Sequence, residues 1–316
     1  MTGTVAVVME GPGSLALRPL ALTPPDAAWA DDALTVAVDW SGISTGTERL
    51  LYTGRMPDFP GMGYPLVPGY ESVGTVIDAG PAVRNRLGET VFVPGANCYD
   101  GARGLFGGAS RRVVLPSKRA HKVDAALGAK AVLLALAATA QHALAIGRIP
   151  ELIVGHGVLG RLLARVIVAH GHAAPVVWET NPARRLGDTG YRVIDPFEDE
   201  RRDYACICDM SGDARLLDTL IARLARGGEI VLGGFYEGRV GFDFAPAFMR
   251  EASLRIAAEW QPADLAAVNA LVATGLLSLD GLITHTDAAA NAAEAYPTAF
   301  GDAACLKMIL DWRACA

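Results

Sequence analysis

The sequence predicts an α/β protein of two domains. The chain has 316 residues, enough for about two domains of ordinary size. Short β-branched runs separated by glycine and proline fill its first part, whereas apolar strands alternate with Ala/Leu-rich helices from about residue 125. The 35 glycines argue against an all-helical bundle. We therefore expect a β-rich domain formed by residues 1–124 and 280–316, and a doubly wound parallel sheet within 125–279.

Composition excludes several classes of protein. With 51% apolar residues and no short repeat, the chain is neither disordered nor fibrous. A net charge of −6 argues against nucleic acid as a partner. No basic segment precedes the first apolar run, so we expect no signal peptide. The uncharged run 131–147 is interrupted by Gln141 and His142, which favours a buried helix over a membrane span.

The five cysteines are scattered and form no CxxC pair, which indicates a reducing, cytoplasmic compartment. Cys206 and Cys208 would share one face of a strand. Packing is favoured over metal binding there, because no further cysteine or histidine lies near them in sequence.

The first domain is expected to be mostly antiparallel. Its predicted strands are Val5–Met9, Leu34–Asp39, Ser72–Asp78, Thr90–Val93 and Arg112–Leu115. An irregular stretch, Tyr52–Pro68, lies between them, and a loop of this length is usually functional.

The second domain is expected to alternate strands and helices around a parallel sheet. Helices are predicted at 125–146, 158–170 and 214–225, and strands at 151–154, 175–179, 204–208, 229–233 and 254–259. The tail from 280, with an apolar run at 282–286 followed by helical stretches to Trp312, does not clearly continue this alternation.

A GxGxxG motif joins the first of these strands to its helix. Gly155 allows the tight turn, Gly157 lets the backbone approach a pyrophosphate, and Gly160 lets the helix pack on the strand. Val158 and Leu159 open the helix, whose free N–H groups would face the anion. At this glycine content the motif can easily occur by chance. Its position between a predicted strand and a predicted helix is what predicts a dinucleotide site.

Glu179 ends the next strand, 19 residues after Gly160, where a carboxylate would accept a hydrogen bond from a ribose hydroxyl. It would repel a 2′-phosphate, which favours NAD over NADP. Arg184 and Arg185 weaken this preference, because a nearby arginine can accommodate the phosphate. The competing interpretation is an exposed acid at a strand end.

Four segments, at 41–48, 67–75, 155–160 and 227–234, give the chain a resemblance to the medium-chain dehydrogenase/reductase superfamily. This resemblance implies a GroES-like catalytic domain, completed by the tail, and a Rossmann nucleotide domain.

Zinc-dependent members carry cysteine or histidine where this sequence has Ser44 or Thr45, Tyr70 and Ala135. Hydroxyls do not hold a catalytic Zn²⁺, and Cys98 is alone in the region of the structural zinc lobe. We expect no metal.

The stretch 56–71, together with 41–48, resembles a subgroup of hydroxyethyl bacteriochlorophyllide dehydrogenases. The resemblance implies oxidation of the C3 1-hydroxyethyl group of a bacteriochlorophyllide, a magnesium tetrapyrrole, to acetyl in bacteriochlorophyll biosynthesis, with NAD⁺ accepting the hydride.

Without zinc, hydrogen-bond donors and a base must serve the alcohol oxygen. Thr47 matches the relay hydroxyl of the zinc relatives, and Ser44 and Tyr70 stand at former ligand positions. Glu71 and Glu48 are nearby carboxylates that could receive the proton finally. The alternatives are that Thr47 caps a turn, that Tyr70 packs and that the glutamates hold the loop.

Further cofactor contacts are expected outside the glycine motif. Thr139 matches a helix residue near the nicotinamide, or bonds back to its own helix. Lys307 matches a cation that reaches the cofactor phosphates, or is simply solvated. His142 is expected to be a satisfied core histidine and His156 to point aside. The carboxyl ends of parallel strands add Met210, Ser211, Gly233 and Phe235.

Substrate contacts are expected from thioethers and aromatic rings, which suit a large planar ligand. Core packing is the competing interpretation. The candidates are Met56, Phe59, Met62 and Tyr64, with Ser44 and Thr45 beside them.

Two rival functions stay open: a zinc-free NADPH-dependent enoyl or quinone reductase, and a non-catalytic nucleotide-binding redox sensor. Fold alone does not choose among them. A homo-oligomer is possible.

Overall fold

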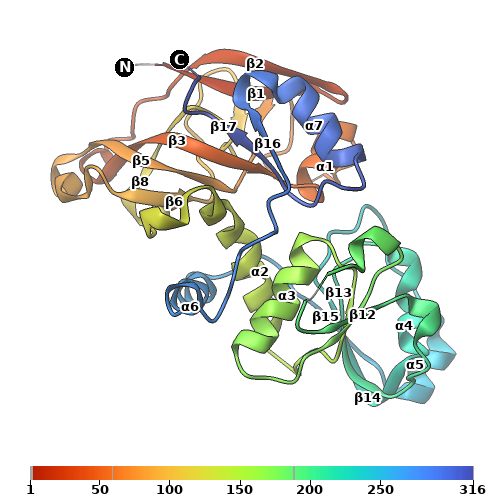
Figure 1. The fold of residues 1–316 in the computed structure, drawn as a ribbon. Helices are drawn as coiled ribbons and strands as arrows, with labels where there is room; N and C mark the ends of the chain where they lie inside the picture. Colours follow the sequence, from red (N-terminus) through yellow and green to blue (C-terminus); the bar gives the residue numbers. More distant parts are fainter. Residues whose placement is uncertain (1–2, 59, 188, 316) are drawn as a thin grey trace. The chain divides into compact units, whose positions relative to one another are not determined.

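The computed structural model describes residues 3–58, 60–187 and 189–315, and it divides into two compact units. The first unit comprises Met1–Ala135 and Asp280–Ala316, and the second comprises Leu136–Leu279. Figure 1 shows the β-rich character of the first unit and the layered strands and helices of the second.

The described part of the first unit contains a four-stranded sheet and a seven-stranded sheet. The smaller sheet has the order β2 (Ser14–Ala21), β1 (Gly3–Gly11), β4 (Leu66–Val67), β7 (Arg103–Gly104). The larger sheet has the order β16 (His285–Ala288), β17 (Met308–Asp311), β3 (Ala33–Ile43), β5 (Ser72–Ala79), β6 (Thr90–Val93), β9 (His121–Lys122), with β8 (Arg112–Pro116) also paired to β3. Its α-helices are α1 (Thr47–Thr53) and α7 (Ala292–Gly301).

Each strand predicted for the first domain is present, as β1, β3, β5, β6 and β8, and most pairs are antiparallel. The sequence predicts helical stretches in the tail up to Trp312, and this is wrong for the last residues, which form β17. There β17 pairs antiparallel with β3 and parallel with β16, so tertiary pairing overrides the local pattern. The prediction missed β2, whose sequence SLALRPLA contains no β-branched residue.

The second unit is built on a parallel sheet with six strands among the described residues. Its order is β12 (Arg192–Ile194), β11 (Val176–Trp178), β10 (Leu152–Val154), β13 (Tyr204–Asp209), β14 (Leu224–Leu232), β15 (Ser253–Ile256). Helix α3 covers one face, and α4 and α5 cover the other (Figure 1). Its helices are α2 (Leu134–Leu144, which begins at the end of the first unit), α3 (Val158–Ala169), α4 (Leu217–Ile221), α5 (Phe244–Arg250) and α6 (Pro262–Ala273).

Two helices are shorter than the sequence predicts. The stretch predicted as helix from 125 begins as a 3-10 helix with a non-helical Gly128 (φ 50°), and α2 starts only at Leu134. The helix predicted for 214–225 ends at Ile221, because β14 already pairs with Tyr204 at Leu224. The short 3-10 helices of the described residues are η1 (Ala30–Asp32), η2 (Pro81–Arg86), η3 (Ser117–Arg119), η4 (Ala125–Leu133), η5 (Pro182–Arg184), η6 (Pro196–Glu198), η7 (Ala214–Leu216) and η8 (Ala289–Asn291).

One stretch of the described chain, Ala125–Leu144, is long enough and apolar enough to cross a membrane, judged by length and composition alone. Half of it is buried within the protein, which is typical of a core helix.

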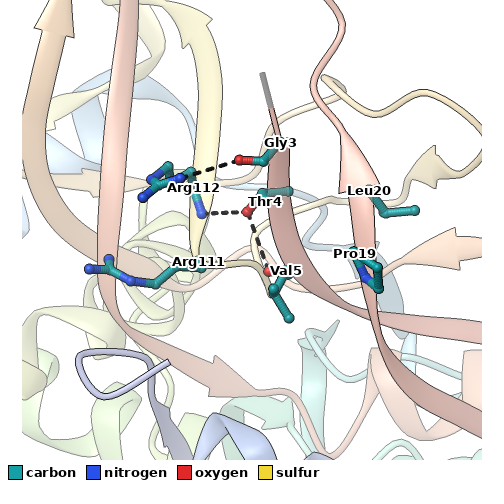
Figure 2. A pocket seen from close by; sticks show the side chains of 7 residues that line it. All are labelled: Gly3, Thr4, Val5, Pro19, Leu20, Arg111 and Arg112. Atoms are coloured by element: carbon teal, nitrogen blue, oxygen red, sulfur yellow. Dashed lines mark hydrogen bonds between the residues drawn. The ribbon is translucent and has the colours of Figure 1, made fainter. Parts of the chain in front are cut away.

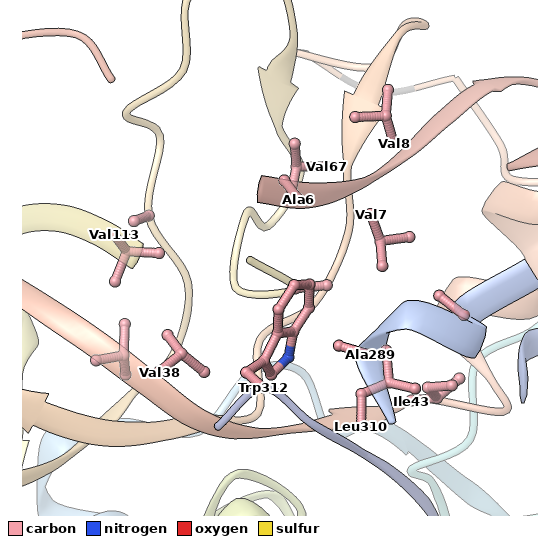
Figure 3. Close-up of a cluster of buried hydrophobic side chains, with 14 of the residues drawn as sticks. Ala6, Val7, Val8, Val38, Ile43, Val67, Val113, Ala289, Leu310 and Trp312 are labelled. Carbon is pink, nitrogen blue, oxygen red and sulfur yellow. The ribbon is translucent and has the colours of Figure 1, made fainter. Parts of the chain in front are cut away.

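Trp312 lies at the centre of the core of the first unit. Its side chain is fully buried among residues of β1, β3 and the tail (Figure 3). The indole Nε1 donates a hydrogen bond to the Ser41 hydroxyl at 2.9 Å. One side chain therefore joins the end of the chain to β3 by both packing and a polar contact.

Trp312→Ala is expected to lower the free energy of unfolding by about 3–5 kcal/mol, because it leaves a large cavity and an unpaired Ser41 hydroxyl. Urea denaturation followed by far-UV circular dichroism measures the loss. Trp29→Ala, at a partly buried tryptophan packed on the same core, is the control and should cost clearly less. Equal losses in the two variants would contradict the central role of Trp312.

Candidate functional site

The predicted phosphate loop leaves β10 at the point where the strand order reverses. β10 lies between β11 and β13, and ligands bind at this position in open parallel sheets. Gly155 has φ +96°, and a Cβ on Gly160 would lie 1.9 Å from the carbonyl oxygen of Gly155. The protein thus requires glycine at both positions. A Cβ on Gly157 would meet no atom within 4 Å, so this glycine leaves open space beside the loop.

Glu179 follows β11 and faces this loop. Its Oε2 accepts the backbone N–H of His156 at 3.1 Å, and its Oε1 accepts that of Asn181 at 2.8 Å. The side chain is 9% exposed, so the alternative of an exposed strand-end acid is wrong. A carboxylate oxygen has two lone pairs, and each oxygen therefore keeps capacity for a ribose hydroxyl.

The two arginines that weakened the NAD prediction have different surroundings. Arg185 is bound to the carboxylate of Asp195 and to the backbone carbonyl of Glu179. Arg184 offers its own carbonyl to the ring of His156 at 2.7 Å. Arg185 is therefore already engaged in an ion pair.

The loops after β13 and β14 are tied together by Asp209. Its Oδ1 accepts the N–H and the hydroxyl of Ser211 at 2.8 and 2.6 Å, and its Oδ2 accepts the hydroxyl of Tyr236 at 2.7 Å. Burial raises the pKa of Asp209. Met210, Ser211, Gly233 and Phe235, all predicted to contact the cofactor, lie on these two loops; Phe235 is 50% exposed.

Three hydroxyls meet in the first unit, as the sequence predicts from Ser44, Thr47 and Tyr70. The Tyr70 hydroxyl lies 2.7 Å from the Ser44 Oγ and 3.5 Å from the Thr47 Oγ1. The ring of Phe106 contacts Tyr70 edge to face, with centroids 5.4 Å apart. Burial, together with the nearby carboxylate of Glu71, raises the pKa of Tyr70. The phenol is therefore neutral and can donate a hydrogen bond.

Beside these hydroxyls lie two buried carboxylates. Glu71 forms an ion pair with Lys307 (Oε2 to Nζ, 2.6 Å), and both side chains are at most 2% exposed. Its Oε1 is buried and has no hydrogen-bond partner among the described residues. Glu48 accepts the Tyr296 hydroxyl at 2.8 Å and the Ser44 N–H at 3.1 Å. Burial raises the pKa of Glu48 to about 7.

Lys307 is not solvated, so that alternative is wrong: its ammonium group binds Glu71 and, at 3.1 Å, the carbonyl of Ile43. Its contact with cofactor phosphates stays a prediction.

The remaining predicted contacts are spread over the fold. Met56 is buried in the core of the first unit, and Met62 and Tyr64 pack partly against that core, which favours the core-packing interpretation. Thr45 is exposed, and Phe59 lies outside the described residues. Val158 and Leu159 open α3, and Thr139 is partly buried on α2.

The histidines and cysteines considered in the sequence analysis as possible site residues are buried or engaged in contacts. His142 is half-buried and binds Asp264 through Nδ1 at 2.8 Å. His156 is buried within the phosphate loop. Cys206 and Cys208 are buried in β13, which agrees with packing.

The resemblance to zinc-dependent dehydrogenases raises the question of a metal site. Within 3–58, 60–187 and 189–315, no group of three or more His, Cys, Asp or Glu side chains could hold a metal ion. At the predicted ligand positions Ser44 and Tyr70 bind one another, and neutral hydroxyls are poor ligands of Zn²⁺. These residues do not fit a catalytic zinc.

A separate pocket lies on the first unit beside β1 and β2 (Figure 2). Its arginines bind backbone carbonyls: Arg112 that of Gly3, and Arg111 those of Val38 and Cys315. None of the predicted site residues lines it.

Asp209 and Tyr236 were not predicted as site residues. Asp209 could have been found, since it is an acidic residue at the carboxyl end of a buried strand. Tyr236 gave no such signal, because its hydroxyl meets Asp209 only where two loops distant in sequence come together.

Comparison with known proteins identifies the class. A model of the alcohol dehydrogenase GroES-like domain matches residues 30–125. The solved structure of a short chain alcohol dehydrogenase from E. coli CFT073, complexed with NADH, has a TM-score of 0.84 at 22% identity, covering 98% of this chain and 100% of that one. The fold is that of the alcohol dehydrogenases, as predicted.

Two relatives identify the family. The 2-desacetyl-2-hydroxyethyl bacteriochlorophyllide A dehydrogenase of Cereibacter sphaeroides is 58% identical over 99% of both chains. The protein of the same name from Rhodobacter capsulatus is 58% identical over 98% of both chains. The chain belongs to this family of dehydrogenases, within the medium-chain dehydrogenase/reductase superfamily, and is an enzyme.

Glu48→Gln is expected to flatten the dependence of stability on pH. The unfolded chain loses the Glu48 proton near pH 4.5 and the folded protein only near pH 7, so stability present below pH 4.5 is lost as pH rises through 7. The difference amounts to about 3 kcal/mol.

Urea denaturation at pH 5 and pH 8 measures this effect. Exposed Glu294→Gln in the same unit is the control and should keep the wild-type pH dependence. A Glu48→Gln protein that weakens between pH 5 and pH 8 as much as wild type would contradict the assignment.

Proposed function

We propose that this enzyme oxidises the C3 1-hydroxyethyl group of a bacteriochlorophyllide to acetyl, in bacteriochlorophyll a biosynthesis, using NAD⁺ and no zinc. The observation that carries the reaction is the 58% identity to two hydroxyethyl bacteriochlorophyllide dehydrogenases over nearly the whole chain. The cluster of the Ser44, Thr47 and Tyr70 hydroxyls supports a reaction at an alcohol oxygen.

The second unit supplies the features of a nicotinamide dinucleotide site. Gly155 and Gly160 shape the loop, while the open space at Gly157 allows the close approach of a pyrophosphate. When bound, the dinucleotide would accept the hydride from the substrate carbon. Two observations support NAD over NADP: the carboxylate of Glu179 beside the loop, and the engagement of Arg185 by Asp195.

The hydroxyl cluster supplies the proton chemistry of the proposed reaction. Tyr70 keeps its proton because burial raises its pKa, so it acts as a donor to the alcohol oxygen or as a relay, and not as the final base. Ser44, at 2.7 Å, is the next group in line, and Thr47 lies at 3.5 Å. Oε1 of Glu71 is a buried carboxylate atom that has no hydrogen-bond partner among the described residues, which supports Glu71 as a candidate final acceptor.

The residue types support zinc-free catalysis. Tyr70 lies at hydrogen-bond distance from the hydroxyls of Ser44 and Thr47, where a catalytic zinc needs thiolate, imidazole or carboxylate ligands. Hydrogen bonds to the developing alkoxide take over the role of the metal.

A cytoplasmic location and self-association are part of the proposal. Cys98, Cys206, Cys208, Cys305 and Cys315 are all free thiols, as a reducing compartment requires. Exposed apolar side chains on α5 and on β15, whose outer edge ends the sheet, support a homo-oligomer with a second copy of the chain.

Purified protein treated with a chelator is expected to reduce NAD⁺ when given a 3-(1-hydroxyethyl) bacteriochlorophyllide, with matching changes in pigment absorption and NADH absorption. Metal analysis should find no stoichiometric zinc. Activity that depends on added zinc would contradict the zinc-free mechanism. A strong preference for NADPH with reduction of C=C bonds would favour a reductase.

Tyr70→Phe is expected to lower kcat by about 10²-fold or more, because a positioned proton donor and relay contributes that much. Initial rates at saturating NAD⁺ measure the loss. Tyr99→Phe is the control, since it also removes a buried hydroxyl, one that binds the carbonyl of Gly107, and its kcat should match wild type. Full turnover by Tyr70→Phe would remove this residue from the mechanism.

A further inference from the structure

His156 stands between the first two glycines of the phosphate loop and is completely buried. Its ring Nδ1 lies 2.7 Å from the carbonyl oxygen of Arg184, and its Nε2 lies 3.0 Å from the hydroxyl of Tyr191. The ring thus bridges the phosphate loop to two points of the chain that follows β11. Neither the glycine motif nor the hydride chemistry requires a histidine at this position.

The protonation state of the ring follows from its partners. A backbone carbonyl only accepts, so Nδ1 must carry the hydrogen and donate it to Arg184. A neutral ring then has a lone pair on Nε2, which accepts the hydrogen of the Tyr191 hydroxyl. Burial lowers the pKa of His156 to about 4, which agrees with a neutral ring at physiological pH.

The bridge fixes the turn that shapes the surroundings of Glu179. This turn, residues 181–185, contains η5. Asn181 begins it and donates its N–H to Oε1 of Glu179, while the N–H of His156 goes to Oε2. The carboxylate is therefore held from both sides, by the phosphate loop and by the turn, and the His156 ring holds these two together.

Arg161 reinforces the same contact from α3. Its guanidinium donates to the carbonyl oxygens of His156, at 3.1 Å, and Arg184, at 3.0 Å. Arg184 O therefore accepts from two donors on the phosphate loop and its helix. Two of the five N–H donors of Arg161 are thereby directed at backbone carbonyls that flank Glu179.

We propose that His156 is a positioning residue for cofactor specificity: it holds the 181–185 turn and Glu179 so that a free ribose diol is accepted and a 2′-phosphate is rejected. This rests on the proposed binding of a nicotinamide dinucleotide. The two backbone donors orient the Glu179 carboxylate, whose remaining lone pairs accept ribose hydroxyls and whose charge repels a phosphate. If the ring is lost, the turn and the carboxylate can move apart, and the preference for NADH over NADPH falls.

The test measures the Kd of NADH and of NADPH by fluorescence titration of the full-length protein. In His156→Leu, which loses both ring contacts, we expect the ratio of the NADPH Kd to the NADH Kd to fall at least tenfold. His156→Asn, with an amide donor near the Nδ1 position, should recover part of the ratio. Tyr191→Phe removes one hydroxyl and should lower the ratio about threefold.

His170→Leu is the matched control, since it removes another histidine, at the end of α3, which binds Gln141 away from the loop. Its two Kd values should equal those of wild type. If the ratio of the NADPH Kd to the NADH Kd is unchanged in His156→Leu, the inference is overturned, even where both Kd values rise together. If His156→Leu does not fold, an unchanged ratio in Tyr191→Phe overturns it instead. Wild-type protein that binds neither dinucleotide would instead overturn the proposed function, and this inference with it.

Discussion

The first unit depends on one buried ion pair, between Lys307 near the C-terminus and Glu71 just before β5. Removing either partner would leave an unpaired charge in the interior, at a cost of about 3–5 kcal/mol. The lysine also binds the carbonyl of Ile43 at the end of β3, so a single ammonium group joins three distant parts of the chain. Gly42 is glycine for the same reason, since a Cβ there would lie 2.2 Å from Oε2 of Glu71.

This pair sets the electrostatics of the hydroxyl cluster next to it. The ion pair with Lys307 fixes the Glu71 carboxylate close to Tyr70. Burial and this carboxylate raise the pKa of Tyr70, because a phenolate there would be poorly solvated and repelled, and the phenol keeps its proton. A protonated phenol in such surroundings is suited to hydrogen-bond an oxygen on which charge develops, because a dipole acts more strongly there than in water.

The sequence predicted the architecture well where a feature is local. The glycine motif between β10 and α3 and the strands of the first unit were visible as patterns, whereas Ser44, Thr47 and Tyr70 were named by their resemblance to positions in the zinc-dependent dehydrogenases. The prediction from sequence failed where contacts between distant parts of the chain decide the structure. The tail strand β17 forms because β3 and β16 pair with it. Lys307 is buried because the carboxylate of Glu71 pairs with its ammonium group in the interior. His156 reads as an ordinary loop residue, since its partners become neighbours only in the fold.

One rule accounts for how both units treat their titratable groups. A buried group stays uncharged unless a fixed partner stabilises its charge. Glu71 has such a partner in Lys307, whereas Tyr70 and His156 have none and stay neutral, and burial raises the pKa of Glu48 to about 7. The neutral groups then contribute by the direction of their hydrogen bonds and not by charge. In the zinc-free reaction that we propose, this arrangement is coherent, because donors aligned on the alcohol oxygen would replace the field of a cation.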